Sequence, residues 1–523
     1  MKVIIPMSGV GQRFIDAGYK DPKPLIDIDG IPMIYHVIDL FPNETNFHFI
    51  CNEKHIAETN MKEILLKKVP NAKITIVPNE GRKGPVHAVS YIFNEIDDQE
   101  EVIVSYCDYG TVWDYKKFLE DMRNNKADGG IASYIGFHPH MLGSDNYAFM
   151  KHNNLWVTDI QEKKPFTQNK MEEYASNGTY YFRFGLYVKH YFQKLMDLDM
   201  NLKGEYYVSL IYKLMLEDSL QVRIFEIDKM LQYGTPKDLE EYLTWSKYFK
   251  EKPMKFRKIE NMTLLLPMAG AGSRFKMVGY DLPKPLLPIH NFPMVVQAVT
   301  ALFPCKKNVF VCLEEHLENY PIADTLVDFF NGNIIDISGV TQGQACTCEI
   351  GIQKANIHND EPLLISACDN GVYYDVDKFY KMIDDETIDV IVWSFTNNPT
   401  SKLYPHMYAW LDVDSDDNIV DVSIKKKFEN KEANHCIIGT MYFRKTSIFL
   451  EGLQEIYSKN LRTNGEFYVD NLLMPLIQNG YKVKVFEVKN YLCWGTPNDY
   501  KTYNYWDEYH NFSAHKSFKQ KHS

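Results

Sequence analysis

A short loop near the start of the sequence has residue types that could bind phosphate groups. It reads Ser8-Gly9-Val10-Gly11-Gln12-Arg13 and follows an apolar run, and Lys23 comes ten residues later between two prolines. Glycines let the backbone approach phosphate oxygens and present N–H groups to them. Arginine offers such oxygens a two-pronged fork, whereas lysine offers a compact charge. The set predicts binding of a nucleoside triphosphate and attack at its α-phosphate, with pyrophosphate as the leaving group.

Two other phosphate-binding loops fit this segment poorly. A dinucleotide-binding fingerprint needs a third glycine, but Phe14 and its neighbours stand at that place. A P-loop needs a lysine directly after its last glycine, and none follows Gly11. The arginine and the proline-flanked lysine therefore distinguish this loop from both.

The same residues return in the second half of the chain, and a strand-end aspartate returns with them. The repeat lies 261 residues later, and its pairs are Gly9/Gly270, Gly11/Gly272, Arg13/Arg274, Lys23/Lys284 and Asp108/Asp369. One exposed basic pair could be an ordinary surface feature, but the same pair in both copies argues against that reading. A period this long indicates two whole domains rather than a solenoid of small units.

The repeat changes what the length of 523 residues implies. Length alone favours three or four domains. The repeat predicts two instead, at residues 1–249 and 262–509, joined by a basic, solvated linker at 250–261. The polar stretch 510–523 is expected to be a flexible tail.

The elements that would position these residues alternate between strands and helices. Short apolar runs at Val3–Ile5, Phe47–Cys51 and Glu101–Tyr106 predict strands of a sheet covered on both faces. Residues 32–41 predict a helix with Pro32 at its start, and Asp114 is expected to cap another. Each half is therefore predicted to be an α/β domain with a doubly wound, mainly parallel sheet.

Composition and charge exclude several classes of function. The 57 lysines and arginines against 69 aspartates and glutamates give a net charge of −12, which argues against a nucleic-acid partner. The apolar runs are too short to span a bilayer, so no membrane partner is expected. Nine scattered cysteines are typical of reduced thiols, and the expected location is cytoplasmic.

These motifs resemble the nucleotidyltransferases that activate sugar 1-phosphates and related phosphorylated metabolites. The likeness runs over nearly all of both halves, and the segments 106–114 and 137–140 look like a capsule or surface-polysaccharide branch. The resemblance implies a Rossmann-like, GT-A-type fold in each half. It also implies that Arg13 and Arg274 hold the β- and γ-phosphates, while Lys23 and Lys284 stabilise charge at the α-phosphate.

Asp108 and Asp369 are the candidate metal ligands. Each ends an apolar strand, which is where ligands sit in open α/β sheets, and a carboxylate there suits Mg²⁺. Capping of the following turn is the competing interpretation. The family commonly has a second metal aspartate two residues before a late Gly-Thr, but this sequence has Gln232 and Cys493 there. Asp470 is an acid of the second half only, and no second ligand is assigned.

The acceptor side of the site is expected to differ between the halves. By the resemblance, Lys163 and Lys425 contact the phosphate of the acceptor, and the neighbouring Glu162 becomes Ile424 in the second copy. A solvated lysine cluster is the alternative. The other candidate acceptor-binding residues are Gly178, Thr179, Glu205, Gly439, Thr440 and Glu466.

Gly84 and Gly343 match the glycine that lets a nucleobase edge lie against the backbone in the family. The residues around them differ, so the base itself is open: CTP is the first choice, with UTP and dTTP as alternatives. His138 and His140 are expected to have a structural or acceptor-pocket role rather than to bind metal.

The sequence thus predicts a tandem enzyme that transfers a nucleoside monophosphate to a phosphorylated small molecule for precursor synthesis. A sugar 1-phosphate is the first acceptor, and a phosphorylated polyol, amino alcohol or amino acid is the alternative. One active half beside a degenerate partner half is a second hypothesis. A fused pair could also act as an internal pseudo-dimer. A glycosyltransferase would need an Asp-x-Asp motif, which Asp108-Tyr109-Gly110 and Asp369-Asn370-Gly371 lack.

Overall fold

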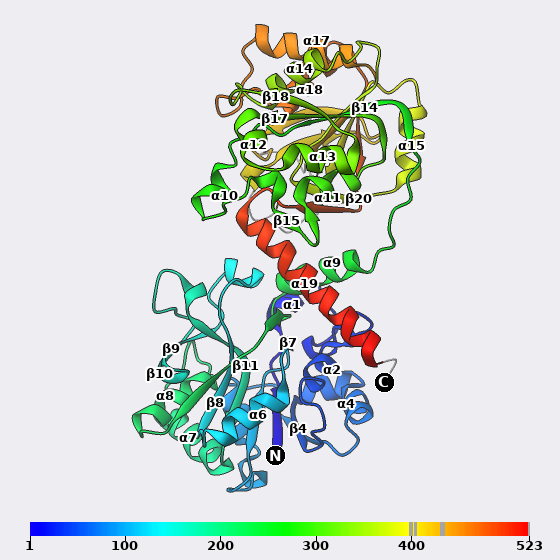
Figure 1. Ribbon diagram of the computed structural model, residues 1–523. Coiled ribbons are helices and arrows are strands. Elements are labelled where there is room, and N and C mark those ends of the chain that lie inside the picture. Colours follow the sequence, from blue (N-terminus) through cyan, green and yellow to red (C-terminus); the bar gives the residue numbers. More distant parts are fainter. Residues whose placement is uncertain (397–400, 402–404, 429–434, 521–523) are drawn as a thin grey trace. The chain divides into compact units, whose positions relative to one another are not determined.

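The computed structural model describes residues 1–396, 401, 405–428 and 435–520. The chain folds into two compact units, Met1–Phe249 and Lys250–Asn511, and each is an α/β fold with helices on both faces of a central sheet (Figure 1). This confirms the predicted α/β class. Among the described residues, no helix is long and apolar enough to cross a membrane.

The first sheet is mixed. The chain runs parallel from strand to strand up to β6, and β11 then lies antiparallel to both of its neighbours, β6 and β8. In order across the sheet the strands are β5 (Lys73–Val77), β4 (Phe47–Asn52), β1 (Lys2–Met7), β6 (Val102–Ser105), β11 (Tyr174–Phe182), β8 (Gly129–Tyr134), β12 (Val222–Glu226), β10 (Trp156–Glu162) and β9 (Ala148–Asn153).

Two hydrophobic cores cover the two faces of this sheet, because successive side chains of a strand point to opposite sides. Val3 and Ile5 of β1 pack into one core and Ile4 into the other. The helices that contribute to the first core are α2 (Met33–Ile38), α4 (Met61–Lys68) and α6 (Tyr115–Asn124). Those that contribute to the second are α5 (Pro85–Ser90), α7 (Gly185–Asp197) and α8 (Ser209–Glu217).

Local signals in the sequence placed several of these elements. The Asp114 side chain accepts a hydrogen bond from the Lys117 N–H and caps α6, as predicted. The helix expected over 32–41 is shorter, since Pro32 is its N-cap and the helix ends at Ile38. The remaining elements of this unit are α1 (Gln12–Asp16), α3 (Glu53–Glu58), α9 (Pro236–Phe249), β2 (Asp27–Ile28), β3 (Ile31–Pro32), β7 (Tyr109–Val112) and β13 (Lys229–Gln232).

The second unit has the corresponding strand order. Its sheet runs β18 (Asn333–Ile337), β17 (Cys305–Leu313), β14 (Ile259–Pro267), β19 (Leu363–Ile365), β24 (His435–Phe443), β21 (Val390–Phe395) and β25 (Val483–Glu487). A hairpin of β22 (Ala409–Val413) and β23 (Ile419–Ile424) pairs with β24. The helices include α10 (Ser273–Met277), α11 (Met294–Thr300), α12 (Glu314–Asn319), α13 (Ile322–Phe330), α14 (Gln344–Lys354), α15 (Val376–Asp384), α17 (Thr446–Ser458), α18 (Leu473–Gln478) and α19 (Pro497–Gln520). Short strand pairs are β15 (Pro288–Ile289) with β16 (Phe292–Pro293) and β20 (Asn370–Tyr373) with β26 (Asn490–Cys493).

The segment predicted as a solvated linker packs against the second unit. Met254 and Phe256 lie against one of its cores, and the Arg257 guanidinium lies 4.4 Å from the ring centre of Tyr380. Strand β14 already begins at Ile259. At the other end, α19 includes residues 510–520 of the stretch predicted as a tail, and 521–523 lie outside the described residues.

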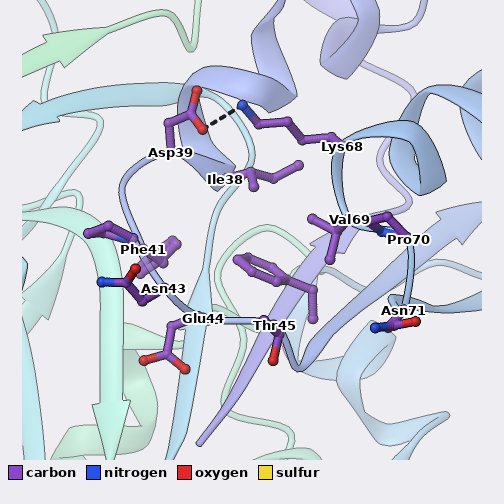
Figure 2. A pocket seen from close by; sticks show the side chains of 12 residues that line it. Ile38, Asp39, Phe41, Asn43, Glu44, Thr45, Lys68, Val69, Pro70 and Asn71 are labelled. Atoms are coloured by element: carbon purple, nitrogen blue, oxygen red, sulfur yellow. Dashed lines mark ion pairs between the residues drawn. The ribbon is translucent and has the colours of Figure 1, made fainter. Parts of the chain in front are cut away.

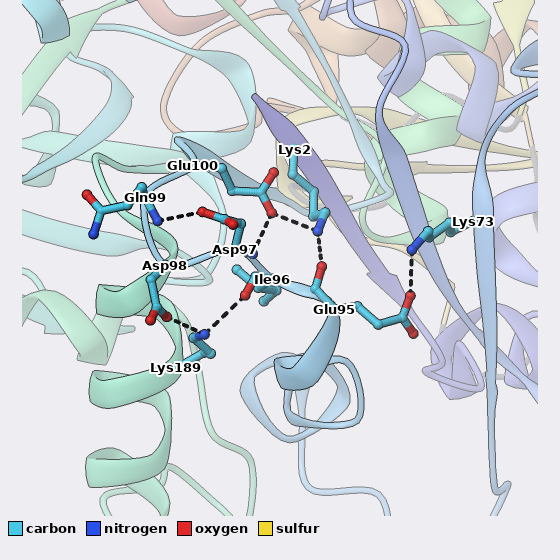
Figure 3. Close-up of polar contacts among 9 residues, drawn as sticks. All are labelled: Lys2, Lys73, Glu95, Ile96, Asp97, Asp98, Gln99, Glu100 and Lys189. Atoms are coloured by element: carbon cyan, nitrogen blue, oxygen red, sulfur yellow. Dashed lines mark hydrogen bonds and ion pairs between the residues drawn. The ribbon is translucent and has the colours of Figure 1, made fainter.

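A network of ion pairs lies at the start of β1, at the opposite end of that strand from the glycine loop (Figure 3). The buried Lys2 ammonium lies 2.7 Å from a carboxylate oxygen of Glu100, and Lys73 pairs with Glu95 at 3.0 Å. These contacts lie at the amino end of β1, and no candidate site residue takes part in them.

Candidate active site

A lysine–aspartate pair occupies the carboxyl end of the central strands in each unit. Lys23 begins a 3-10 turn directly after Pro22, and its Nζ donates to Asp108 Oδ2 at 2.5 Å. The same ammonium donates to the Gly234 carbonyl at 2.8 Å. In the second unit Lys284 pairs with Asp369 Oδ2 in the same way. The structure thus brings together two residues that lie 85 positions apart in the sequence.

The glycine loop makes room for this lysine. Gly11 has a φ of 71° at the start of α1, and a Cβ atom there would lie 3.1 Å from Lys23 Cβ. Gly272 has a φ of 61°, with Lys284 Cβ at 3.8 Å. Positive φ favours glycine at both places. Gly9 and Gly270 have open space on the side where a Cβ would stand, so their backbone is accessible to a ligand.

The electrostatics of the pair are clearest in the second unit. Burial alone would raise the pKa of Asp369, but the charge and hydrogen bond of Lys284, together with the charge of Arg274, hold that pKa below its ordinary value. Burial likewise opposes the charge on Lys284, and Asp369 raises the lysine pKa overall. Both groups are therefore ionised at neutral pH. Arg13 and Arg274 are exposed on α1 and α10, beside their respective pairs.

A short pair of antiparallel strands, remote from one another in sequence, lies beside the aspartate. Strand β13 pairs with β7 so that Gln232 lies opposite Tyr109, and a Cβ on Gly234 would lie 3.2 Å from Asp108 Oδ2. The second unit repeats this with Cys493 opposite Asn370, and Gly495 lies equally close to Asp369. These glycines let the backbone that follows β13 and β26 approach the carboxylate.

The positions where a second metal aspartate would be expected hold neutral groups. Gln232 Oε1 accepts from the Gly234 N–H at 2.9 Å, and its amide donates to Tyr147 OH at 3.0 Å. Burial raises the pKa of Cys493, so the thiol stays protonated and donates to Asp499 Oδ2 at 3.4 Å. Neither strand pair therefore supplies a carboxylate two residues before the late Gly-Thr, in addition to Asp108 or Asp369.

Two further acids lie near the sites and were missed from the sequence. Asp238 and Asp499 stand in the first turns of α9 and α19, and each accepts a hydrogen bond of 2.6 Å from a neighbouring threonine hydroxyl. Burial raises the pKa of both carboxyls, while Arg13 and Lys23 act to lower it for Asp238 and Arg274 for Asp499. Their equal spacing after the repeated Gly-Thr-Pro was the signal that could have identified them.

The predicted acceptor lysines occupy equivalent places in the two units. Lys163 and Lys425 have φ values of 56° and 60°, and their N–H groups donate to the carbonyls of Tyr147 at 2.8 Å and Tyr408 at 3.0 Å. Burial lowers the pKa of each lysine. Their ammonium groups differ in partner: Lys163 Nζ bonds Tyr207 OH at 2.5 Å, whereas Lys425 Nζ bonds the Met407 carbonyl at 2.6 Å.

Other predicted acceptor residues are divided between surface and interior. Glu205 and Glu466 are exposed on equivalent turns. Thr179 and Thr440 are fully buried, and their hydroxyls bond Tyr109 OH and, at 2.9 Å, Ser366 Oγ. Both threonine hydroxyls are thus used in hydrogen bonds within the protein interior. The preceding Gly178 and Gly439 have φ values of 100° and 91° in strands β11 and β24.

Gly84 and Gly343 are glycines because the protein backbone passes close to them. A Cβ on Gly84 would lie 2.8 Å from the Tyr206 nitrogen, and one on Gly343 would lie 2.6 Å from the Phe467 nitrogen. Their φ values of 92° and 139° also favour glycine. The sequence prediction gave these glycines a role towards the nucleobase, and the structure adds a packing requirement that the sequence did not reveal.

Comparison with known proteins bears on the first unit. The sequence profile of the family described as nucleotidyl transferase matches residues 2–242. These residues form a nucleotidyltransferase domain. The match spans most of the first unit and ends before the second begins.

Several solved structures are similar to about half of the chain. The nucleoside-diphosphate-sugar pyrophosphorylase from Vibrio cholerae RC9 is 20% identical, covers 46% of this chain and 99% of its own, and has a TM-score of 0.38. A putative glucose-1-phosphate thymidylyltransferase from Bacillus anthracis is 18% identical, with coverage of 49% and 98% and a TM-score of 0.39. The inositol-1-phosphate CTP transferase from T. maritima is 15% identical, with coverage of 47% and 95% and a TM-score of 0.37.

In the nucleotidyltransferase domain, the two candidate histidines are packed inside the protein. His140 Nε2 lies 2.9 Å from Tyr134 OH, and burial lowers the pKa of His138 to about 4. Among the described residues, no group of three or more histidine, cysteine, aspartate or glutamate side chains could hold a metal ion.

A surface pocket of the same domain lies apart from the site (Figure 2). It is bounded by the ends of α2 and α4, where Lys68 pairs with Asp39 at 2.5 Å. The predicted site residues do not line it.

Proposed function

We propose that each unit transfers a nucleoside monophosphate from a nucleoside triphosphate to the phosphate of a small acceptor. An oxygen of the acceptor phosphate attacks the α-phosphorus, the bond to the β-phosphate bridging oxygen breaks, and pyrophosphate leaves. The observation that carries the proposal is the lysine–aspartate pair beside a glycine loop, present in both units. No covalent nucleophile is needed, since positioning and electrostatics can supply the rate.

Each of the basic residues would bind a different phosphate group of the two substrates. Arg13 and Arg274, exposed at the start of a helix, would bind the β- and γ-phosphates. Lys23 and Lys284 would stabilise the charge that develops at the α-phosphate. Lys163 and Lys425 would bind the acceptor phosphate.

The donor set fits Mg²⁺ in a site with one protein carboxylate. Mg²⁺ commonly keeps several waters and is held by one or two carboxylates plus substrate phosphates. Asp108 and Asp369 would hold it, and Gly234 and Gly495 place no side chain beside the carboxylate. When bound, the ion would neutralise charge on the phosphates and help align the acceptor.

We further propose a sugar 1-phosphate as acceptor and CTP as the nucleotide, in the synthesis of surface-polysaccharide precursors. A phosphorylated polyol, amino alcohol or amino acid is the alternative acceptor, and UTP or dTTP the alternative nucleotide. The support is the resemblance of the glycine loop, the proline-flanked lysine and the acceptor lysine segment. A degenerate second unit is the competing hypothesis, and the Lys284–Asp369 pair argues against it.

The test is pyrophosphate release from the full chain with arrays of nucleoside triphosphates and phosphorylated acceptors. Wild type should release pyrophosphate with at least one pairing, while Asp108→Asn and Asp369→Asn should each abolish the activity of one unit. Absence of release from every pairing by wild type would overturn the proposal. If Asp369→Asn left every activity intact, the second unit would be a scaffold.

A further inference from the structure

The acceptor sides of the two units can be compared residue by residue, because the strand register is the same. Glu162 is the last residue of β10 and pairs with Ala148, and Ile424 is the last residue of β23 and pairs with Ala409. The acceptor lysine follows directly in both units. Glu162 and Ile424 therefore occupy the same position.

The residue that lies across from this position also changes. Ser209 begins α8 and stands four residues after Glu205, and Asp470 stands four residues after Glu466 in the 3-10 turn before α18. Glu205 and Glu466 make the same isolated bridge, to Leu202 and Thr463. The first unit thus has a glutamate on the strand and a serine on the helix. The second has an isoleucine on the strand and an aspartate beside the helix.

In the first unit the two side chains bond to one another. Ser209 Oγ donates to Glu162 Oε2 at 2.6 Å. In the second unit the Asp470 carboxylate takes the place of the serine hydroxyl, and the isoleucine at the strand position offers it no hydrogen-bonding group. Burial raises the pKa of Asp470 to about 6, and the charge of Lys425 opposes that rise.

A carboxylate in such a place costs folding free energy, because the protein only partly replaces its hydration. Serine at this position, as in the first unit, would avoid the cost. A perturbed carboxyl beside a cationic group in a candidate pocket is a typical feature of a functional residue.

We infer that Asp470 binds hydrogen-bond donors of the acceptor in the second unit, a role that belongs to Glu162 in the first. The inference rests on the proposed function. The donors are hydroxyl or ammonium groups of a phosphorylated small molecule whose phosphate lies on Lys425. Since the carboxylate stands on β10 in the first unit and in the 3-10 turn before α18 in the second, the two units select different acceptors.

The experiment uses the full chain with one unit silenced. In an Asp108→Asn background, acceptor KM and kcat are measured for the second unit with CTP, UTP and dTTP. The acceptors are glucose 1-phosphate, glucosamine 1-phosphate and phosphocholine, which offer hydroxyls, hydroxyls with an ammonium, and no donor. Asp470→Asn should raise acceptor KM at least tenfold for the preferred donor-bearing acceptor and leave nucleotide KM within twofold.

A reciprocal variant gives the matched control. Ile424→Glu with Asp470→Ser rebuilds the first unit's pair in the second, and the acceptor preference should move towards that of the first unit measured in an Asp369→Asn background. Unchanged acceptor KM in Asp470→Asn, or equal turnover of phosphocholine, would overturn the inference. Loss of all second-unit turnover in Asp108→Asn alone would also overturn it while leaving the first unit's function standing. Only a wild type inactive with every pairing would refute the proposed function itself.

A stability measurement separates acceptor binding from a structural role. Because the folded-state pKa of Asp470 is raised, its contribution to stability is complete at low pH and is lost as the pH rises through about 6. Asp470→Asn should therefore unfold at a higher temperature than the parent at pH 8 and at a similar temperature at pH 4. A lower unfolding temperature at pH 8 would show that Asp470 holds the fold together and would overturn the assignment.

Discussion

Lys23 and Asp108 of the first unit have close counterparts in Lys284 and Asp369 of the second. The residues around the acceptor lysines, in contrast, have exchanged their chemistry: a carboxylate on a strand in one unit is replaced by a carboxylate beside a helix in the other. The comparison shows that the residues assigned to the triphosphate have the same types and the same contacts in both units. The role proposed for Asp470 makes acceptor recognition depend on which of the two positions carries the carboxylate.

The largest effect on activity should come from substitution of the lysine of the lysine–aspartate pair, which both units share. Lys23→Met removes the charge expected at the α-phosphate, and kcat/KM of the first unit should fall by about 10²- to 10³-fold. Lys284→Met should do the same to the second unit only. Pyrophosphate release with the acceptor preferred by each unit separates the two. Equal loss of both activities from either variant would show that the units do not act as separate sites.

Substitution of the glycines that precede α5 and α14 should have the second-largest effect. Gly84→Ala and Gly343→Ala place a Cβ against backbone atoms of Tyr206 and Phe467 at a positive φ. We expect a loss of about 3 kcal/mol in the free energy of unfolding of the affected unit. Gly9→Ala and Gly270→Ala are the matched controls, because open space surrounds the new methyl, and denaturant unfolding should show little change.

The pH dependence of second-unit activity tests the role of Asp470 towards the acceptor. With a pKa of about 6, Asp470 loses its charge below that pH, so second-unit kcat/KM for the acceptor should fall about tenfold per pH unit. The charged groups around Asp470 include Lys425, whose pKa burial lowers, and Lys425 is in turn influenced by the charges of Arg274 and Glu466. The acceptor phosphate itself titrates near pH 6. Asp470→Asn is therefore the reference, and a profile identical to the parent's would contradict the prediction.

The smallest effect should be on stability, at a second place where the two units use different side chains. It is the contact between the turn that joins β2 to β3, or β15 to β16, and the last helix of the unit. Asp29 accepts from Ser246 Oγ at 2.7 Å and Tyr242 OH at 3.0 Å, whereas His290 lies 3.0 Å from Asp507. Asp29→Ala leaves two hydroxyls without their acceptor and should cost about 2 kcal/mol. Asp507→Ala should cost about 1 kcal/mol. Chemical denaturation followed unit by unit would measure both.

The sequence allowed the α/β class, the helix caps and the residues of the repeated loop to be predicted, because these depend on local spacing and on a constant shift between copies. Asp108 and Lys23 were predicted as site residues from their types, and the structure places them in contact. The mixed sheet was not foreseen, since the polar residues Ser176, Asn177 and Thr179 interrupt the apolar pattern of β11, although the whole strand is buried. The packing role of Gly84 and the burial of Thr179 depend on Tyr206 and Tyr109, which are remote in sequence.

The pairing of Lys23 with Asp108 has a thermodynamic consequence. In the absence of substrate the two opposite charges satisfy one another, so a phosphate that recruits the lysine leaves the carboxylate with unmatched negative charge. The affinity of that carboxylate for a cation then rises by the same factor by which the cation strengthens phosphate binding, because linkage between two sites is reciprocal. At the proposed site the salt bridge would make nucleotide and cation cooperative ligands, and titration calorimetry of each in the presence of the other would measure the coupling.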